Sequence, residues 1–337
     1  GSAVGDKAGV VAALLAAVHP LLWINDIMLL SEGLYQPLIV AVGWAGYVWS
    51  REPTRRRIVL LGVAIACAAM TRAEAISLFG LLLLPLLAWG NPLGRADRVR
   101  QAGLGIGVGV IVLAPWLIYN NLRFEEPVTL TSATGQVLLA GSCDPAWEGD
   151  SMGFWAVCGA LPEVVAEIER ELPGSTRPFN DPDRILYDES VMNNVLTGIA
   201  FDYINDNRNR YPKVVLARMG RTLELFRVQH SLRLNYGIEG RWRVPSTAGL
   251  VLYYLLLPPS VFALWVLRSQ GVRLTVPLSL WAMVLFASAT TFGLTRYRAP
   301  VDVMMVLLTG ITASWLWGRY EDRRRETVLV RSMTDDS

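Results

Sequence analysis

The chain lacks the patterns that mark metal, nucleotide and nucleic-acid sites. Only three of its 337 residues are cysteine, and no group of carboxylates has the spacing of a metal-ligand set, so no metal ion is predicted. No glycine-rich loop follows an expected strand, so nothing indicates a nucleotide-sugar site. The net charge of +2 is nearly balanced and gives no indication of nucleic-acid binding.

Long apolar runs are what the chain has instead. Hydrophobic residues make up 53% of it, and its mean hydropathy is +0.36. A bilayer core takes roughly 20 apolar residues per helix, and somewhat shorter runs are tolerated. Eight runs are candidates, near residues 8–24, 27–49, 58–70, 73–89, 103–119, 247–267, 274–292 and 300–317. The sequence therefore predicts an all-α protein that crosses a membrane several times.

The arginines are sorted between the connections that join these runs. Short connections rich in Arg and Lys stay on the cytoplasmic side of a membrane. One alternating topology places four basic groups inside, namely Arg51 with 55–57, Arg95 with Arg98 and Arg100, Arg268 with Arg273, and Arg319 with 323–325. The same topology places the long polar stretch outside. We therefore expect a multi-pass protein of the cytoplasmic membrane with one large extracytoplasmic loop.

This topology divides the chain into four segments. Residues 1–119 form a transmembrane block of about five spans, and residues 247–318 form a second block of three spans. Residues 120–246 are expected to form a small extracytoplasmic loop domain of mixed secondary structure, and residues 319–337 a short charged cytoplasmic tail, disordered at its end. The chain opens with Gly-Ser, and its first methionine is Met28, which favours a fragment of a longer protein over a cloning scar.

The loop segment has its own pattern. Pro127–Leu139 is rich in β-branched residues around a glycine, which is typical of a short strand or extended segment. Helical periodicity predicts three amphipathic helices, over residues 162–172, 189–206 and 212–228. In the last of these, Arg218 and Arg221 point away from the apolar face. That helix would either lie on the membrane with its arginines toward the headgroups or pack as an ordinary helix on the loop domain.

Two of the three cysteines lie in the loop segment. Cys67 falls inside an apolar run and is interpreted as a small packing residue. Cys143 and Cys158 fall on the expected outer side, where disulfides persist. We therefore predict a disulfide between these two residues, and the alternative is two free thiols.

Three arginines remain in the short turns on the expected outer side. Arg72 follows the third apolar run, and Arg296 and Arg298 precede the last one. A charge so close to hydrocarbon is costly and usually has an anionic partner. If all three converge, the expected partner is a lipid phosphate, which a guanidinium binds with two hydrogen bonds. Alternatively, Arg72 pairs with Glu74 or extends to the interface, and the other two are interface anchors.

Five short motifs occur in order along the chain. They are His19-Pro20 followed by Ser31-Glu32; Met70-Thr71-Arg72-Ala73-Glu74; Ala114-Pro115-Trp116 with Asn120-Asn121; Thr131 to Gly135 with Cys143 and Gly153-Phe154-Trp155…Cys158; and Arg296-Tyr297-Arg298-Ala299-Pro300. Together they resemble motifs of GT-C glycosyltransferases of the protein O-mannosyltransferase and aminoarabinose-transferase type, although Asn120 stands where arginine is common. The likeness covers most of the chain and implies a GT-C-like helical bundle.

The resemblance implies transfer of a sugar from a polyprenyl-phosphate carrier to an acceptor outside the membrane. The acceptor would be a cell-envelope glycan, a glycolipid or a protein, and no cofactor is needed beyond the lipid-linked donor. Arg72, Arg296 and Arg298 would hold the departing phosphate. In this family the catalytic carboxylate lies in the first external loop, which is expected upstream of residue 1, so the catalytic base is not identified. Asp26 and Glu32 are the candidates within the chain.

Some of these residues also have other interpretations. Glu32 would either bind the sugar or a metal, or pair with one of the arginines. Asp26 would assist on the acceptor side. Asp302 could neutralise Arg298, and His19 at the end of a span fits a hydrogen-bonded structural residue. Some proteins of this architecture use a divalent ion, but none is predicted here.

Two other classes of function fit the same hydropathy pattern. The first is a membrane transporter or flippase for a lipid-linked or anionic substrate, which often has broken helices and inverted repeats at the bilayer midplane. The second is a membrane scaffold whose loop binds a partner. Because the unusual charges lie at the expected outer surface, glycosyl transfer is the preferred hypothesis and transport is the alternative.

Overall fold

The computed structural model describes residues 2–89, 91–178 and 180–335. Residue 1 of the predicted segment 1–119 and residues 336–337 of the predicted segment 319–337 therefore lie outside the described residues. The described part of the chain forms helices, turns and irregular segments, and it contains no strand. This confirms the all-helical class, whereas the mixed secondary structure predicted for the loop domain is wrong.

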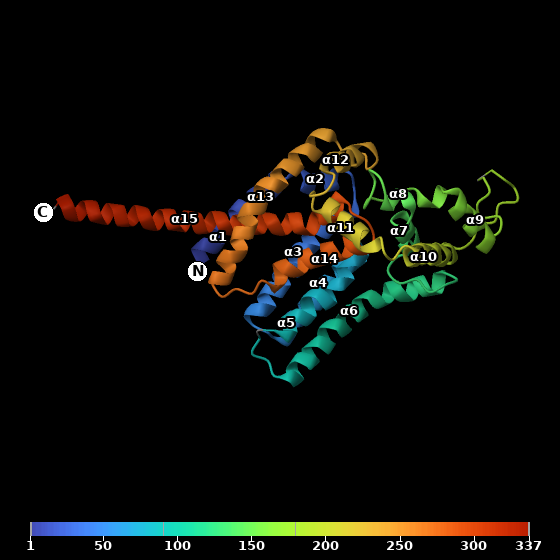
Figure 1. Ribbon diagram of the computed structural model, residues 1–337. Coiled ribbons are helices and arrows are strands. Elements are labelled where there is room, and N and C mark those ends of the chain that lie inside the picture. The colour runs from blue at the N-terminus through green and yellow to red at the C-terminus, as the bar shows by residue number, and fades with distance from the viewer. Residues whose placement is uncertain (1, 90, 179, 336–337) are drawn as a thin grey trace.

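Helices group into a bundle and a smaller helical domain beside it (Figure 1). The bundle consists of α1 (Ser2–Val18), α2 (Pro20–Ile27), α3 (Ser31–Arg51), α4 (Arg55–Thr71), a 3₁₀ turn (Ala73–Ser77), a π-helical turn (Phe79–Leu83), α5 (Leu84–Ala88), α6 (Arg95–Arg123), α13 (Arg243–Ser269), α14 (Thr275–Thr290), a 3₁₀ turn (Thr295–Arg298) and α15 (Ala299–Asp335). The helical domain consists of α7 (Thr134–Ala140), α8 (Asp144–Trp147), a 3₁₀ turn (Cys158–Ala160), α9 (Pro162–Glu171), α10 (Glu189–Asp206), α11 (Tyr211–Thr222) and α12 (Val228–Gly237).

The bundle has two distinct ends. One end lies next to α7–α10 and is termed the domain-facing end (Figure 1). The opposite end carries the connections between α3 and α4, α5 and α6, and α13 and α14, and α15 extends far beyond it (Figure 1). Two helices of the domain also touch the bundle, because α11 packs on α14 and α12 packs on α13. The arginine-rich connections therefore lie at the end remote from the helical domain.

In the part of the chain that the structure describes, three helices are long and apolar enough to cross a membrane, namely α6, α13 and the helical stretch Thr295–Arg325. Lys7–Val18 and Pro20–Ile27 meet this requirement only together, and they are bent by 55°. Ala73–Ala88 and Thr275–Thr290 are apolar but shorter. Of the eight predicted spans, three are thus supported by helix length and composition, or four if the bent pair is one span.

Prolines account for the irregular predicted spans. The span predicted over 8–24 bends because His19 is extended (φ −76°, ψ 108°), as expected before the ring of Pro20. In the span predicted over 73–89, Pro85 has no N–H to donate to the carbonyl of Leu81. The chain there adopts a π-helical turn, and Ser279 Oγ of α14 donates to Leu81 O at 2.5 Å. A neighbouring helix thus supplies a donor to a carbonyl that Pro85 cannot reach, as apolar surroundings require.

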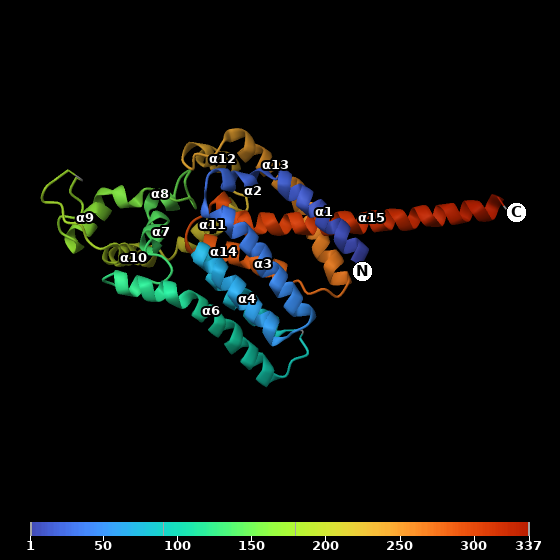
Figure 2. The ribbon, with the colours of Figure 1, turned by 180° about the vertical axis from the view of Figure 1, so that it is seen from behind.

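Glycines allow two pairs of helices to approach closely. A Cβ atom on Gly62 of α4 would lie 2.3 Å from the carbonyl oxygen of Gly105 on α6. A Cβ atom on Gly310 of α15 would lie 2.4 Å from the carbonyl oxygen of Ala8 on α1. Figure 2 shows the results: α4 lies beside α6, and α1 runs along α15. Such small-residue contacts are typical of helix packing in membranes.

The helical domain differs from its prediction in two segments. Of the strand or extended segment predicted over Pro127–Leu139, no strand is observed: residues 127–133 belong to no helix or strand, and from Thr134 the chain forms α7, which packs on α10. The predicted helices over 162–172 and 189–206 are confirmed as α9 and α10. The helix predicted over 212–228 ends at Thr222, and α12 begins six residues later.

Arg218 and Arg221 of α11 are buried, so the orientation predicted for them is wrong. α11 packs against α14 and not with its arginines toward headgroups. Arg218 Nη1 donates to Ala289 O at 2.9 Å, and Arg221 Nε donates to Met152 O at 2.6 Å. Backbone carbonyls from distant segments replace the water that these guanidinium groups lose.

The predicted tail is helical as far as Asp335, because α15 continues beyond the bundle (Figure 1). Its charged stretch consists of helix-forming residues, with Glu321 four residues before Arg325, the spacing that supports a helix. The predicted disorder at residues 336–337 lies outside the described residues. The charged segment is therefore an extension of α15 and not a separate tail.

Candidate functional site

Glu32 joins three segments at the domain-facing end. It lies in the first turn of α3 and is buried. Its Oε1 accepts a hydrogen bond from Arg72 Nη1, at the C-terminal end of α4. The same oxygen lies 3.7 Å from Arg296 Nε, in the turn that precedes α15. Pairing with arginines, one of the two interpretations of Glu32, is thus observed.

Arg72 is held by carboxylates and aromatic rings. Its Nε donates to Glu74, so the predicted alternative of an Arg72–Glu74 pair is observed as well. Its guanidinium carbon lies 5.1 Å from the centre of the Tyr297 ring and 5.9 Å from that of Tyr35, within reach of cation–π attraction. Arg72 is therefore fixed in place, with only 11% of its side chain exposed.

Arg296 is more exposed and less well bonded. Its side chain is 32% exposed, against 11% for Arg72. Its Nη1 lies 3.4 Å from Glu239 Oε2, and its Nε lies 3.7 Å from Glu32 Oε1, so both contacts are longer than ordinary hydrogen bonds. Within the described residues, its Nε is buried without a hydrogen-bond partner. Arg296 therefore has donor capacity that its carboxylates do not fill.

Arg298 lies in a different environment from the other two predicted arginines. It is fully buried, its Nε donates to Asp302 Oδ1 at 2.9 Å, and its guanidinium lies 3.6 Å from the centre of the Tyr253 ring. Neutralisation by Asp302, which the sequence suggested, is observed. The three arginines thus do not share one partner: Arg298 pairs with Asp302, one helical turn later, whereas Arg72 and Arg296 both lie at Glu32.

Sequence reasoning missed two members of the site, Glu239 and Arg241. Both lie in the short segment between α12 and α13, which has no periodicity or motif to single them out. Arg241 is buried, and its Nη2 donates to Asn25 Oδ1 at 3.2 Å. Burial lowers the pKa of Arg241, and the nearby carboxylates of Glu239 and Glu32 oppose this effect.

The site as a whole is termed the charged cluster. It has three arginines and three carboxylates, so its formal charges balance: Arg72, Arg241 and Arg296 with Glu32, Glu74 and Glu239. An additional anion would meet Arg296 first, because this is the most exposed arginine and the one with an unfilled donor. The arrangement can therefore hold a phosphate or carboxylate group if Arg296 turns away from its long contacts.

Asp26 and His19, the other two residues that the sequence singled out near the start of the chain, differ in exposure. Asp26 is exposed on α2, and a Cβ atom on Gly33 of α3 would lie 2.6 Å from its Oδ1. It therefore lies beside the first turn of α3, the turn that carries Glu32. His19 is buried before α2, and its Nδ1 has no hydrogen-bond partner in the described part of the chain. The predicted structural role fits its burial, whereas the predicted hydrogen bond is not observed at this atom.

The helical domain holds the turn that carries Arg296. Leu294 N donates to Thr222 Oγ1 at 3.2 Å, and Thr295 Oγ1 donates to Glu224 Oε1 at 2.6 Å. Glu224 is buried and has a left-handed backbone (φ 53°), which is strained for a residue with a side chain. Burial raises the pKa of Glu224, while Arg298 and the bond from Thr295 lower it. The position of Arg296 therefore depends on the helical domain.

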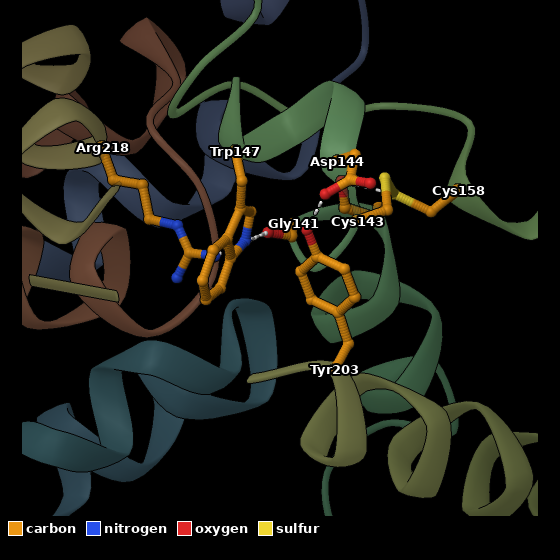
Figure 3. Close-up of a disulfide and its surroundings, with 8 residues drawn as sticks. Gly141, Cys143, Asp144, Trp147, Cys158, Tyr203 and Arg218 are labelled. Atoms are coloured by element: carbon orange, nitrogen blue, oxygen red, sulfur yellow. Dashed lines mark hydrogen bonds between the residues drawn. A yellow bond between two sulfur atoms is a disulfide. The ribbon is translucent and has the colours of Figure 1, made fainter. Parts of the chain in front are cut away.

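A disulfide lies in the helical domain (Figure 3). Cys143 and Cys158 are bonded, with their Cα atoms 5.8 Å apart, so the disulfide and not the pair of free thiols is observed. Trp147 Nε1 donates to Gly141 O at 2.8 Å, and Arg218 Nη2 donates to the same oxygen at 2.6 Å (Figure 3). The disulfide region is thus linked to α11, which packs on the bundle.

Among the described residues, no group of three or more His, Cys, Asp or Glu residues could hold a metal ion. The site thus offers guanidinium groups and carboxylates, which bind anions and accept protons. No protein-family model, curated protein or solved structure matches the chain. The GT-C resemblance therefore remains a likeness of short motifs, and the function has to be argued from the geometry of the charged cluster.

Proposed function

We propose that the protein is a glycosyltransferase of the cytoplasmic membrane that uses a sugar linked to a polyprenyl phosphate. The acceptor is a glycan, glycolipid or protein on the outer side. One observation carries the proposal: Arg72 and Arg296 share Glu32 at one end of an apolar helical bundle, and Arg296 keeps an unfilled donor. A polyprenyl carrier lies in the hydrocarbon and presents its phosphate at the interface, where such a cluster would meet it.

The reaction needs a cation at the leaving group and a base at the acceptor. The acceptor oxygen attacks the anomeric carbon, and the bond from that carbon to the phosphate oxygen breaks. The phosphate keeps the electron pair, and the hydroxyl proton passes to a carboxylate. Negative charge on the phosphate grows during this step, so fixed cations lower the barrier. Arg72 and Arg296 supply the cations, and Asp26, an exposed carboxylate beside the turn of α3 that carries Glu32, is the candidate base. Arg298 is fully buried and donates to Asp302, so it is not assigned a role at the phosphate.

Binding of a lipid phosphate tests this proposal directly. The purified protein in lipid nanodiscs is titrated with decaprenyl phosphate, and decaprenol serves as the probe that lacks phosphate. We expect Arg296→Gln to weaken phosphate binding about tenfold or more, because hydrogen bonds to charged groups contribute about 1.5–3 kcal/mol. The matched control is Arg123→Gln, which removes the same charge from an exposed position at the end of α6.

Two results would contradict the proposal. The first is equal binding of decaprenyl phosphate and decaprenol by the wild-type protein. The second is an equal loss of affinity in Arg296→Gln and Arg123→Gln, which would mean that only the general surface charge matters. Unfolding temperatures of both variants should match the wild type, since Arg296 makes no short contacts.

The membrane topology is tested separately by labelling single cysteines with an impermeant reagent. With Cys67 replaced by Ala, we expect Asn180→Cys to react in intact cells and Glu52→Cys to react only after permeabilisation. Both positions are exposed, so accessibility depends on the side of the membrane alone. Labelling of Glu52→Cys but not of Asn180→Cys in intact cells would reverse the proposed orientation.

Transport of a lipid-linked or anionic substrate is the second candidate function. The observation in its favour is the broken helix geometry, because Lys7–Val18 and Pro20–Ile27 are bent by 55° and the stretch before α5 is irregular. Transporters use such breaks at the bilayer midplane. The charged cluster lies instead at the domain-facing end, which favours the transferase. Movement of a fluorescent lipid-linked probe across vesicles containing the protein, without any glycosyl acceptor, would favour transport.

A further inference from the structure

A groove opens on the side of the bundle between α1, α3, α14 and α15. Its volume is about 370 Å³, and its walls are almost wholly apolar, with Ile39 and Gly43 on one side and Met304 and Leu308 on the other. Along α3 it extends from Ile39 to Tyr47, a rise of ~12 Å. These walls belong to a part of the molecule that the proposed membrane placement puts in hydrocarbon. An acyl chain is the molecule that such a groove admits in a bilayer.

Arg273 lies in the connection between α13 and α14, where the groove reaches the opposite end of the bundle. It is the only charged residue among the described residues that line the groove. Its Nη1 is buried, and no atom in the described part of the chain accepts a hydrogen bond from it. A buried charged donor without a partner is costly, because it has lost water and gained nothing in return. Arg273, which is half-buried, can therefore donate to an anionic ligand at this end of the groove.

We propose that the groove binds one anionic phospholipid, with an acyl chain along α3 and α15 and the phosphate on Arg273. The two observations complement each other, because the groove supplies apolar contact and Arg273 supplies the charge at its end. The charged cluster lies at the other end of the bundle and takes no part in this contact. The inference does not depend on sugar transfer; it depends only on the membrane placement of the bundle.

Competition between an anionic and a zwitterionic lipid tests whether the charge of Arg273 contributes to lipid binding. Delipidated protein in mild detergent is titrated with dioleoylphosphatidylglycerol and with dioleoylphosphatidylcholine, and bound lipid is counted by native mass spectrometry. We expect the wild-type protein to prefer the anionic lipid about tenfold, the ratio that ~1.4 kcal/mol supplies. Arg273→Gln should abolish this preference. Arg268→Gln, at an exposed position on the same end, should leave it unchanged.

Filling the groove with a larger side chain tests whether its apolar walls contribute to lipid binding. A Cβ atom on Gly43 would meet Met304 Cε and Val276 Cγ1 at 3.8 Å, an ordinary contact, so the longer side chain of Gly43→Leu would enter the groove. We expect it to weaken the binding of both lipids. If that variant does not fold, Gly9→Leu serves the same purpose, since nothing lies within 4 Å of a Cβ atom on this lining residue.

Four outcomes would overturn the inference. They are equal affinity of the wild-type protein for the two lipids, an equal effect of Arg268→Gln and Arg273→Gln, unchanged binding when the groove is filled, and displacement of the lipid by inorganic phosphate at an equal concentration. Flotation with phosphatidylcholine vesicles separates this failure from that of the membrane placement. Protein that floats but shows no lipid preference keeps its membrane placement and loses only the lipid site, whereas protein that does not float loses both.

Discussion

Two arginine–aspartate pairs with nearly the same sequence spacing lie at opposite ends of the bundle. At the domain-facing end, Arg298 and Asp302 are 2.9 Å apart and their side chains are 0% and 3% exposed. At the opposite end, Arg100 and Asp97 are 3.8 Å apart and are 70% and 54% exposed. The residue types are the same and the spacings are nearly so, whereas the contact distance and above all the burial differ, so most of the difference in energy is expected to come from burial. Water screens the exposed pair of Asp97 and Arg100, whereas both side chains of the buried pair, Arg298 and Asp302, have lost their contact with water.

The comparison extends to the other arginines at the two ends. At the opposite end, Arg51, Arg55 and Arg268 are exposed, as expected of groups that set orientation and interact with water and headgroups. At the domain-facing end, Arg72 and Arg241 are enclosed by carboxylates, rings and amides. Other arginines at the opposite end bond backbone carbonyls, as Arg57 does with Val48 O and Arg98 with Leu93 O, so the two ends differ in how far their arginines are enclosed and not in whether they take part in the fold. A count of basic residues alone does not distinguish exposed arginines from enclosed ones.

Removal of the buried cation should have the largest effect on stability. Arg298→Met leaves Asp302 buried without a counter-charge, and breaking a buried pair in this way costs about 3–5 kcal/mol. We expect a free energy of unfolding that is lower by this amount in detergent, measured by chemical denaturation. The same substitution at Arg100 serves as the matched control and should change little.

A second variant distinguishes loss of the charge pair from loss of packing. Arg298→Met combined with Asp302→Asn removes both charges, so it should recover a large part of the lost stability. If the double variant is as unstable as Arg298→Met alone, then the stacking of Arg298 on Tyr253, 3.6 Å from the ring centre, and not the charge, dominates.

The disulfide should rank next. Replacing Cys143 and Cys158 by serine opens a loop with a sequence separation of 15, and loops of this size lose about 3 kcal/mol in the chain-entropy model. We expect earlier thermal unfolding of the helical domain and faster proteolysis between α8 and α9. Cys67→Ala in the bundle is the control, because Cys67 is a free thiol. An equal loss of stability in both variants would show that the disulfide contributes nothing specific.

Much of the bundle could be predicted from the sequence, because apolar runs report burial in hydrocarbon directly. The helices near 58–70 and 103–119 lie where hydropathy placed them. The bend at Pro20 and the π-helical turn before Pro85 could not be located in detail, since they depend on bonds such as that from Ser279. The strand at Pro127–Leu139 was wrong because β-branched residues are a weak local signal that packing overrode.

The site was predictable only in part. Arg72, Arg296 and Glu32 lie in turns or at helix starts where a charge is costly, and the sequence singled them out for that reason. Glu239 and Arg241 were missed because they follow no pattern, and their role appears only when the chain brings α12 and α13 to the cluster. The burial of Arg218 could not be foreseen, since its acceptors, Gly141 and Ala289, are remote in sequence.

The pH dependence of stability should be changed by Glu224→Gln. Burial raises the pKa of Glu224, so the folded protein holds this proton more tightly than the unfolded chain does. Its contribution to stability is therefore complete below the unfolded pKa, about 4.3, and is lost as the pH rises through the higher folded value. Glu224→Gln keeps an oxygen acceptor for Thr295 but cannot ionise. We expect the unfolding temperature of the wild type to fall more than that of the variant between about pH 5 and about pH 8.

The control for this experiment is Glu163→Gln, at an exposed position on α9. It should leave the pH profile of the wild type unchanged. Parallel profiles for the wild type and Glu224→Gln would show that the carboxyl group of Glu224 does not titrate differently in the folded and unfolded states. The turn that carries Arg296 would then rest on its backbone and threonine contacts alone.

The smallest effect is expected for Arg100→Gln. The pair that Arg100 makes with Asp97 is exposed and 3.8 Å long, so solvent and salt screen it, and pairs of this kind contribute about 0–1 kcal/mol. We expect a change in the free energy of unfolding below about 0.5 kcal/mol, measured at low and at high salt. The residual effect should vanish at high salt, because screening acts on exposed charges first. An effect comparable with that of Arg298→Met would mean that burial does not explain the difference in energy between the two arginine–aspartate pairs.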